Sequence, residues 1–348
     1  MLLRSTSTEG PPKQLQDHVG VPLKETETRQ SRVFPAASVM SIFQTMGKGT
    51  ALRAMFGQPQ IVRLVGAHNG LTARLVEQEG FQGVWASSLE VSASHAVPDA
   101  NILTMTEYAS AARDMNESVE IPVVVDADQG YGGVAQVARL VRVLESAGIA
   151  GVAIEDKSFP KANSLLPGAR QQLVSIAEFR AKIMAARDAQ RLADMMLIAR
   201  TEALIAGHCM AEALERSYAY AGAGADAILI HSRSSTPDEI VQFASQWTST
   251  VPLAIVPTSY PSFTEEAISR YPAIKMVIYA NPVIRAVIGS VRSLLQEIRA
   301  SGGIGTVSPR LVPMEEVFRL QRATELAAWE DRYESRGAAT HAAKALRA

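Results

Sequence analysis

Apolar residues along this chain gather into short runs that alternate with stretches of helical spacing. In the stretches between the runs, apolar residues recur at helical intervals, as at Leu71, Leu75 and Val76. Strands that are apolar on both faces and alternate with helices predict a parallel sheet covered by helices. Eight such units predict a closed (β/α)8 barrel of the TIM type, within the α/β class. The predicted strands are Ile61–Ala67, Gly83–Ser87, Ile121–Asp126, Gly151–Glu155, Met195–Arg200, Asp226–His231, Pro252–Pro257 and Lys275–Ala280.

A doubly wound open sheet is the alternative arrangement of the same elements. Such sheets commonly bind nucleotides through a glycine-rich turn after a strand, and no G-x-G-x-x-G or Walker-type loop follows any run here. Glycines instead mark the ends of helices, as at Gly80, Gly148 and Gly224. We therefore expect the closed barrel.

The two ends of the chain differ from the part between them. Residues 1–40 are rich in Ser, Thr, Pro, Gln and charge, which predicts a flexible N-terminal extension. Residues 41–335 are expected to form the catalytic barrel domain, and residues 336–348 a tail without an assigned role. Within the domain, Val283–Ile298 and Met314–Leu326 have amphipathic spacing. Such apolar faces need either a partner subunit or the surface of their own barrel.

Composition and charge narrow the class of protein. The 348 residues are 47% hydrophobic and 20% charged, enough to bury a large core, and the net charge of −1 gives no basic field for nucleic acid or an anionic membrane. No run approaches the ~18 apolar residues of a membrane span. The single cysteine, Cys209, excludes an internal disulfide framework. Acidic residues near the start argue against a transit peptide, so we expect a cytoplasmic protein with neither nucleic acid nor membrane as partner.

Polar and ionisable residues directly follow the apolar runs. In a (β/α)8 barrel the carboxyl ends of all strands meet at one face, where catalytic groups lie. One such group alone has a structural explanation as often as a functional one, but their recurrence at successive strand ends predicts a site. The groups are the Trp85–Glu90 segment, the acidic pairs Asp126 with Asp128 and Glu155 with Asp156, and then Arg200 and His231.

The residue types at these ends favour one kind of chemistry. Asp126, Asp128 and Glu155 are oxygen ligands of the sort that Mg²⁺ prefers, and no His/Cys cluster has the spacing of a zinc site. Arg200 can hold a carboxylate or phosphoryl group through two parallel hydrogen bonds. Hydroxyls and backbone amides around Ser87 can hold a second anionic end. We therefore expect Mg²⁺ as cofactor and a small, doubly anionic substrate.

The segment after the fourth run resembles a known motif. Glu155-Asp-Lys-Ser-Phe-Pro-Lys-Ala-Asn-Ser164 is similar to the E-D-K-x5-N-S motif of phosphoenolpyruvate mutases, in the isocitrate lyase/phosphoenolpyruvate mutase superfamily. Residues 67–74, 126–132, 199–203 and 225–232 also resemble this family, and the resemblance spans residues 45 to 335. It implies a (β/α)8 barrel whose eighth helix is swapped between subunits of a homo-oligomer, commonly a dimer of dimers. It also implies Mg²⁺ and a three-carbon 2-oxo acid or enol substrate.

The resemblance also implies roles for individual residues. It implies Mg²⁺ contact by Asp126, with Asp128 and Glu155 reaching the ion directly or through water. The residues expected to be catalytic are Asp99, which also reaches toward the metal, with Lys161, Asn163, Ser164, Arg200 and His231. The residues expected to bind substrate are Trp85, Ser87, Ser88, Leu89 and, on the gating loop, Leu165.

The reaction implied by the resemblance moves the phosphoryl group of phosphoenolpyruvate from oxygen to C3, giving phosphonopyruvate through a metaphosphate-like species. However, residues 89–103 and 231–240 resemble phosphonopyruvate hydrolase, a relative that cleaves the C–P bond with water. In that hydrolase the position of Asn163 typically holds threonine. We give the loop more weight, because an amide donor over the phosphoryl group bears directly on whether water or carbon attacks. A mutase is therefore expected, with the hydrolase as the alternative.

Two further interpretations are disfavoured. The C–C lyases of the superfamily carry a catalytic cysteine in a K-x-C-G-H-like loop, whereas the corresponding residues here are Lys161-Ala-Asn-Ser-Leu165 and Cys209 lies far along the chain. An inactive scaffold barrel would have no reason to keep acidic residues together with Arg200 and His231 at its mouth.

Overall fold

The computed structural model describes residues 46–166 and 168–345 of the chain. The extension predicted for residues 1–40 lies outside the described residues. The strands form a closed barrel in chain order, and all neighbouring strands are parallel. The strands are β1 (Val62–Ala67), β2 (Gly83–Ala86), β3 (Val123–Asp126), β4 (Gly151–Glu155), β5 (Met196–Thr201), β6 (Ala227–Ile230), β7 (Leu253–Ile255) and β8 (Ile274–Tyr279).

All eight predicted strands are present, which confirms the (β/α)8 barrel. The largest difference is at β7, which keeps three of the six predicted residues. Pro252 precedes this strand and Pro257 follows it. Proline has no backbone N–H for a ladder hydrogen bond, so it limits the strand at both ends.

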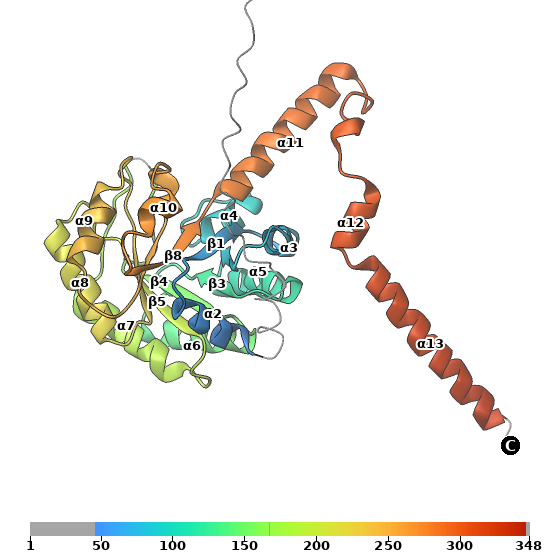
Figure 1. Cartoon of the computed structure of the whole chain (residues 1–348), viewed down its shortest axis with the longest axis horizontal. Coiled ribbons are helices and arrows are strands. Elements are labelled where there is room, and N and C mark those ends of the chain that lie inside the picture. The colour runs from blue at the N-terminus through green and yellow to red at the C-terminus, as the bar shows by residue number, and fades with distance from the viewer. Residues whose placement is uncertain (1–45, 167, 346–348) are drawn as a thin grey trace, which may run out of the picture. The chain divides into compact units, whose positions relative to one another are not determined.

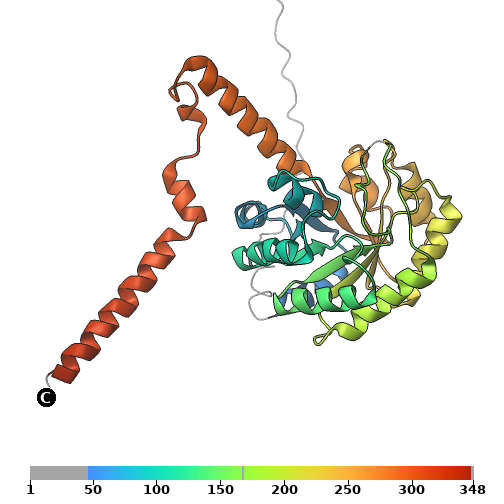
Figure 2. The ribbon, with the colours of Figure 1, turned by 180° about the vertical axis from the view of Figure 1, so that it is seen from behind.

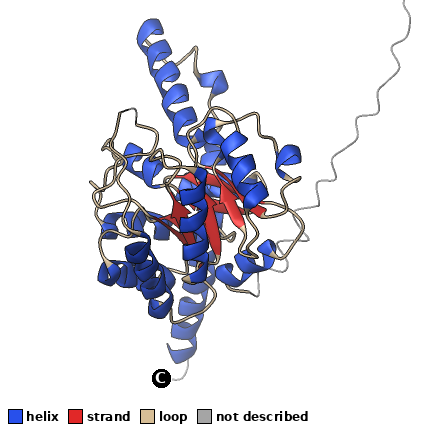
Figure 3. Cartoon of the chain, turned by 90° about the vertical axis from the view of Figure 1, so that its left-hand side faces the viewer, coloured by secondary structure: helices blue, strands red, loops and turns tan. Residues whose placement is uncertain are grey.

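Helices surround the strands, as Figures 1 and 2 show from opposite sides and Figure 3 shows by secondary structure. The α-helices are α2 (Lys48–Phe56), α3 (Gly70–Gln78), α4 (Ser88–Ser94), α5 (Met105–Ser118), α6 (Val134–Ser146), α7 (Ile176–Ala189), α8 (Met210–Gly222), α9 (Asp238–Gln246), α10 (Glu265–Ile268), α11 (Pro282–Ser301), α12 (Met314–Leu320) and α13 (Ala323–Ala345). Short 3₁₀ helices are η1 (Pro257–Ser259) and η2 (Ser308–Arg310).

Local sequence explains where several helices begin. Asn69 caps α3 and Thr104 caps α5, and in each case the side chain of the third helical residue bonds back to the cap. These reciprocal bonds satisfy backbone N–H groups that have no partner inside the helix. Ser87 caps α4 by accepting a bond from the backbone of Glu90. Because this cap follows β2 immediately, the strand passes into the helix at the carboxyl end of the barrel.

The apolar core has two layers. The larger layer lies between the strands and the surrounding helices. The smaller layer fills the barrel interior. Most strands contribute alternate residues to it, among them Leu64, Trp85 and Ile198. The fully buried Leu52 of α2 belongs to this inner layer. The amino-terminal part of the barrel is therefore a packed core, as is usual for this fold, and leaves the carboxyl end for chemistry.

The C-terminal helices expose much of their apolar surface. The helix predicted over Val283–Ile298 is present as α11, but Ile284 is its one buried residue. The amphipathic run predicted over Met314–Leu326 is two helices, because the chain breaks at Arg322, whose φ of +55° is left-handed. Within the described residues, no helix combines the length and the apolar character needed to cross a bilayer.

Candidate active site at the carboxyl end of the barrel

The side chains at the barrel mouth follow from the two-residue period of the strands. Residues two apart on a strand point to the same face. Trp85, Val124, Ala153, Ile198 and Leu229 all belong to the inner apolar layer. The residues two positions further along therefore point inward as well, one layer above the core: Ser87, Asp126, Glu155, Arg200 and His231.

Two cations hold the carboxylates at this mouth. Lys161 Nζ lies 2.9 Å from Asp99 Oδ1 and forms a still shorter contact with Asp128 Oδ1. Arg200 lies 3.6 Å from Asp126 Oδ2 and 3.4 Å from Glu155 Oε2. All these side chains are nearly inaccessible to solvent. The sequence-predicted acidic residues are therefore brought together, and two of the predicted basic residues lie among them.

Ser88 links Lys161 to Asp126, the carboxylate that lies beside Arg200. Its hydroxyl donates to Asp126 Oδ2 over 3.1 Å and accepts from Lys161 Nζ over 3.0 Å. Ser88 is the first residue of α4, and Leu89 follows it. The backbone N–H groups of a helix's first turn have no partner inside the helix. The backbone N–H groups of Ser88 and Leu89 in this turn are therefore donors beside the carboxylates, whereas Ser87 N already donates to Ala67 O over 3.3 Å.

The mouth holds more buried negative charge than Lys161 and Arg200 neutralise. Burial raises the pKa of Asp128 to about 7, and the nearby carboxylates of Asp99, Asp126 and Glu155 add to the rise against the opposing effect of Lys161. Burial opposes charge on Lys161, but the carboxylates raise its pKa well above its usual range, so the lysine stays charged. An additional cation would therefore be bound favourably here.

The donor set fits Mg²⁺ bound largely through water. Within the described residues, no three acidic, histidine or cysteine side chains converge as a ready-made ligand set. Mg²⁺ usually retains several waters and takes one or two carboxylates directly, so it does not require such a set. Glu155 Oε1 is buried and has no hydrogen-bond partner among the described residues, with Lys157 Nζ 3.9 Å away as its ion-pair partner. Its hydrogen-bonding capacity is therefore unused, which suits a water molecule of a hydrated divalent cation.

A second cluster joins Arg200 to His231. Arg200 Nε lies 2.6 Å and His231 Nδ1 lies 2.9 Å from the same oxygen, Glu202 Oε1. Arg200 Nη2 is also 3.0 Å from His231 Nδ1. Burial alone would raise the pKa of Glu202, but Arg200, Lys157 and His231 lower it well below its usual range. The ionised Glu202 thus fixes Arg200. When Nδ1 of His231 carries the proton, Glu202 also orients the imidazole, and Nε2 is the second polar atom of the ring.

A loop after β4 lies at the mouth and is closed at its base. The lid loop comprises residues 158–166 and 168–172. Ser158 N donates to Gln172 O over 2.9 Å, and Lys157 and Leu173 form an antiparallel bridge. The buried Lys157 also donates to Ala162 O at 3.0 Å and to Ser164 Oγ at 2.6 Å. These bonds direct the middle of the lid loop toward the barrel.

Three predicted loop residues are in contact with the mouth. Besides the contacts of Lys161, Asn163 Nδ2 donates to Asp99 Oδ2 over 2.6 Å. Ser164 Oγ donates to Glu202 Oε2 over 2.6 Å and lies 3.2 Å from Arg200 Nη2. The amide, the hydroxyl and the ammonium group thus lie among the buried carboxylates and Arg200.

Two of the predicted substrate-binding residues lie elsewhere. Trp85 is 1% exposed and belongs to the inner apolar layer, below the polar groups. The side chain of Leu165 is 41% exposed on the lid loop. The reasons differ. The two-residue period of β2 sends Trp85 into the core. The bonds of Asn163 and Ser164 turn those two side chains toward the mouth and leave Leu165 facing outward.

Three residues of this site were not among the predicted ones. Glu202 and Lys157 both lie in segments that resemble the family, and their position at strand ends was a usable signal. Asn101 lies in the hydrolase-like segment of residues 89–103, but no strand end singled it out, because it is in a loop. Its side chain accepts from Lys161 N at 2.9 Å and Gln129 Nε2 at 2.7 Å, and donates to Asp128 Oδ2 at 2.9 Å. It thus joins the lid loop to the turn after β3.

Comparison with known proteins identifies the family. Residues 52–299 match the family model described as phosphoenolpyruvate phosphomutase. The chain is 46% identical over 288 residues to the phosphonopyruvate hydrolase of Variovorax sp. (strain Pal2), which covers 83% of this chain and 99% of the relative.

Solved structures agree with both the fold and the family. The phosphoenolpyruvate phosphomutase from Streptomyces platensis subsp. rosaceus has a TM-score of 0.80 and 47% sequence identity, covering 83% of this chain and 99% of its own. A phosphonopyruvate hydrolase in complex with oxalate and Mg²⁺ has a TM-score of 0.79 and 45% identity, with the same coverage. The chain is an enzyme that belongs to the phosphoenolpyruvate phosphomutase family, within the isocitrate lyase superfamily.

Proposed function

We propose that this enzyme is a Mg²⁺-dependent phosphoenolpyruvate phosphomutase that interconverts phosphoenolpyruvate and phosphonopyruvate. The reaction breaks the bond between phosphorus and the enol oxygen and forms one between phosphorus and C3, so it consumes no water and releases no phosphate. The family, the buried acidic mouth and the polar lid loop support this proposal. With Mg²⁺ bound among the carboxylates, Arg200 and the backbone donors of α4 would suit a small anionic substrate.

The substrate's two anionic ends have different partners in the proposed complex. The carboxylate lies against the backbone N–H groups of Ser88 and Leu89 at the start of α4. The phosphoryl group lies between Arg200 and His231, whose positions are fixed by Glu202. Arg200 can hold phosphoryl oxygens through parallel, charge-assisted bonds. The carbon skeleton then spans the mouth above the inner apolar layer.

The buried carboxylates are proposed to hold the metal ion. Asp126 is the direct ligand, and Asp99, Asp128 and Glu155 take part directly or through water. When bound, Mg²⁺ supplies positive charge that stabilises the enolate oxygen of pyruvate. Mg²⁺ in the complex of a relative with oxalate supports this cofactor, because oxalate is also a small anion with adjacent carboxylate oxygens.

The lid loop controls the fate of the phosphoryl group. As the P–O bond breaks, negative charge spreads over the three phosphoryl oxygens. The ammonium group of Lys161 and the second N–H of the Asn163 amide are placed to stabilise it, whereas the one proton of Ser164 is donated to Glu202. The same loop excludes water, so that the nucleophile available to phosphorus is C3 of the enolate. No proton has to be transferred. The protein's task is therefore to position the groups and to keep solvent out.

The observation that carries the mutase proposal is the amide of Asn163, held within the mouth by Asp99 at 2.6 Å. The alternative is phosphonopyruvate hydrolysis to pyruvate and phosphate. The hydrolase-like segment of residues 89–103 favours this alternative because it contributes Asp99 and Asn101, both of which contact the lid loop. The 46% identity to a phosphonopyruvate hydrolase favours it as well.

The two functions give different products from the same starting material. Phosphonopyruvate is incubated with the enzyme and Mg²⁺, and the products are followed by ³¹P NMR. We expect phosphoenolpyruvate. Inorganic phosphate with pyruvate as the main products would establish the hydrolase instead, and an unchanged phosphonopyruvate signal would contradict both. Removing Mg²⁺ with a chelator is expected to stop the reaction, and adding it back is expected to restore it.

The active form is proposed to be a homo-oligomer in which α11 of one subunit packs on a neighbour. Val287, Ile288, Val291 and Leu295 form an apolar stripe along α11, and each is at least 38% exposed in the single chain. Exposed apolar stripes of this length commonly mark an interface between subunits. Exchange of α11, the helix after β8, between two barrels would bury this stripe, and a dimer of dimers is the proposed assembly.

A further inference from the structure

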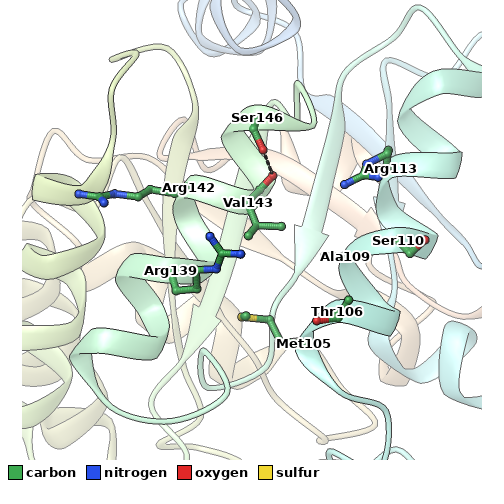
Figure 4. A pocket seen from close by; sticks show the side chains of 9 residues that line it. All are labelled: Met105, Thr106, Ala109, Ser110, Arg113, Arg139, Arg142, Val143 and Ser146. Atoms are coloured by element: carbon green, nitrogen blue, oxygen red, sulfur yellow. Dashed lines mark hydrogen bonds between the residues drawn. The ribbon is translucent and has the colours of Figure 1, made fainter.

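A groove between α5 and α6 lies on the outside of the barrel. Its volume is about 360 Å³, near the lower end of the ~300–1,000 Å³ usual for ligand pockets. Figure 4 shows its lining, in which Arg113 belongs to α5 and both Arg139 and Arg142 belong to α6. The lining residues all come from these two helices, so the groove is separate from the barrel mouth.

The three guanidinium groups of this arginine groove are not neutralised by the protein. None of the lining residues is acidic. In the part of the chain that the structure describes, no hydrogen bond or ion pair holds Arg113, Arg139 or Arg142. A second groove offers a contrast, because its Arg53 is held by both carboxylate oxygens of Asp226, at 2.8 and 2.9 Å. An arginine in a surface groove can thus already be paired with a carboxylate of the protein. The arginines of the arginine groove are not paired in this way, so their positive charge is available to an anion.

Two of the three arginines direct their charge into the groove. Arg139 and Arg142 are three residues apart on α6, a spacing at which like charges repel and weaken the helix. In Figure 4, Arg113 and Arg139 extend from facing helices toward the space between them, while Arg142 extends along the other side of α6. Exposed side chains exchange rotamers within nanoseconds, so Arg142 can turn toward a bound anion. An anion in the groove would pair with Arg113 and Arg139, and Arg142 would add its charge after this turn.

The other lining residues indicate the chemistry of the ligand. Thr106 and Ser110 provide hydroxyl groups on the α5 side, and Met105, Ala109 and Val143 provide an apolar surface. A carboxylate has two oxygens and matches one guanidinium fork. A phosphate monoester has three terminal oxygens and two negative charges, so it can pair with several guanidiniums at once. Its carbon portion would lie on the apolar surface.

We propose that the arginine groove binds the phosphate monoester of a small metabolite, at a site distinct from the barrel mouth. The groove is open to solvent, and its three arginines are exposed. A ligand can therefore enter without any movement of the barrel. Because binding depends on the charge of exposed guanidiniums, it is expected to weaken as salt concentration rises.

Isothermal titration calorimetry of the full chain with glycerol 3-phosphate tests the proposal. Mg²⁺ is present, and oxalate is added only in the amount that fills the barrel mouth, because an excess would itself pair with the arginines of the groove. We expect one saturable site per chain in the native enzyme. Replacing both facing arginines, Arg113→Gln with Arg139→Gln, is expected to raise Kd at least tenfold, and Arg142→Gln alone is expected to raise it less.

The control variant is Arg180→Gln, which removes an exposed arginine from α7 outside the groove and is expected to leave Kd unchanged. Glycerol, which lacks the phosphate, is expected not to bind. The native circular dichroism spectrum verifies that each variant is folded. Absence of binding to the native enzyme, or equal Kd values for the native enzyme and the double variant, would overturn the proposal. Since neither arginine lies at the mouth, these results are independent of which reaction the enzyme catalyses.

Discussion

At the scale of single residues, the site depends on how its buried carboxylates, which outnumber the buried cations, are paired. Lys161 pairs with Asp99 and Asp128, and Arg200 lies beside Asp126 and Glu155. Removing one partner of such a pair leaves a buried charge uncompensated, which costs several kcal/mol. Neutral groups that only orient these charges can be changed with less damage to the fold. They are therefore the better probes of mechanism.

Asn163 is the first such probe. In the proposed mutase, Asn163→Thr removes the amide donor that faces the phosphoryl group while keeping a polar side chain. We expect kcat for phosphoenolpyruvate formation to fall by roughly tenfold or more, as for loss of a transition-state donor, with KM nearly unchanged. The control Leu166→Ala changes an exposed residue of the same loop and is expected to be nearly neutral. Equal losses in kcat and in substrate affinity would contradict the assigned role.

Asn101 is the second probe, because it positions the lid loop and does not touch the proposed substrate. Its φ of +57° is left-handed, so Asn101→Gly removes the amide without adding backbone strain. Loss of its bonds to Lys161 N and Asp128 is expected to lower kcat roughly tenfold while the enzyme remains folded. Ala96→Gly is the matched control, since Ala96 has a φ of +56° on the surface. Steady-state kinetics that do not distinguish the two variants would rule out a positioning role.

At the scale of elements, the junction between β8 and α11 depends on a residue from another helix. Asn281 precedes α11 but its side chain makes no capping bond. Glu90 Oε2, from α4, accepts from Ile284 N at 3.2 Å and lies 3.2 Å from His68 Nδ1. Glu90 is completely buried, and its other carboxylate oxygen has no partner among the described residues. The start of α11 is thus held by a carboxyl group in an unfavourable setting for charge.

This setting predicts a pH dependence of stability. Burial raises the pKa of Glu90, against the opposing effect of His68. The folded state therefore keeps a proton that the unfolded chain has released. The free energy of unfolding then falls as pH rises from the ordinary glutamate pKa of about 4.3 to the raised pKa, with a limiting slope of about 1.4 kcal/mol per pH unit. We expect Glu90→Gln to lose less stability over this interval than the native enzyme does.

Urea unfolding at one fixed protein concentration, between about pH 4.5 and about pH 8, measures this effect. Glu117→Gln serves as the control, because it removes an exposed carboxyl group from α5. If the native enzyme and Glu90→Gln show parallel curves of unfolding free energy against pH, then Glu90 does not titrate in this range.

At the scale of the whole molecule, α11 tests the proposed assembly. Leu295 is 58% exposed on the apolar stripe of α11, and burying a carboxylate at this position in an interface would be strongly unfavourable. We expect Leu295→Glu to shift the enzyme to smaller species in sedimentation velocity. The neighbouring Gln296→Glu introduces the same charge on an exposed polar position and is expected to keep the native size. A native sedimentation coefficient for Leu295→Glu would show that this stripe does not form the interface.

Much of this architecture was predictable because its signals are local. Apolar runs and helical spacing indicated all eight strands, and the rule that strand ends meet at one face indicated Asp126, Glu155, Arg200 and His231. The motif after β4 indicated Lys161, Asn163 and Ser164. Trp85 could not be placed in this way. Its position near a strand end suggested the mouth, but its register directs it into the inner apolar layer.

The sequence by itself determined the order of the elements and the residue types at the barrel mouth, since both follow from periods of two and about 3.6 residues along the chain. Only the tertiary structure decided which charged groups have a partner of opposite charge and which do not. It brought Asn101 to Lys161, Glu90 to the start of α11, and Arg113 opposite Arg139. The physical reason is that electrostatic and hydrogen-bond energies depend on distances between groups remote in sequence, and chain closure sets those distances.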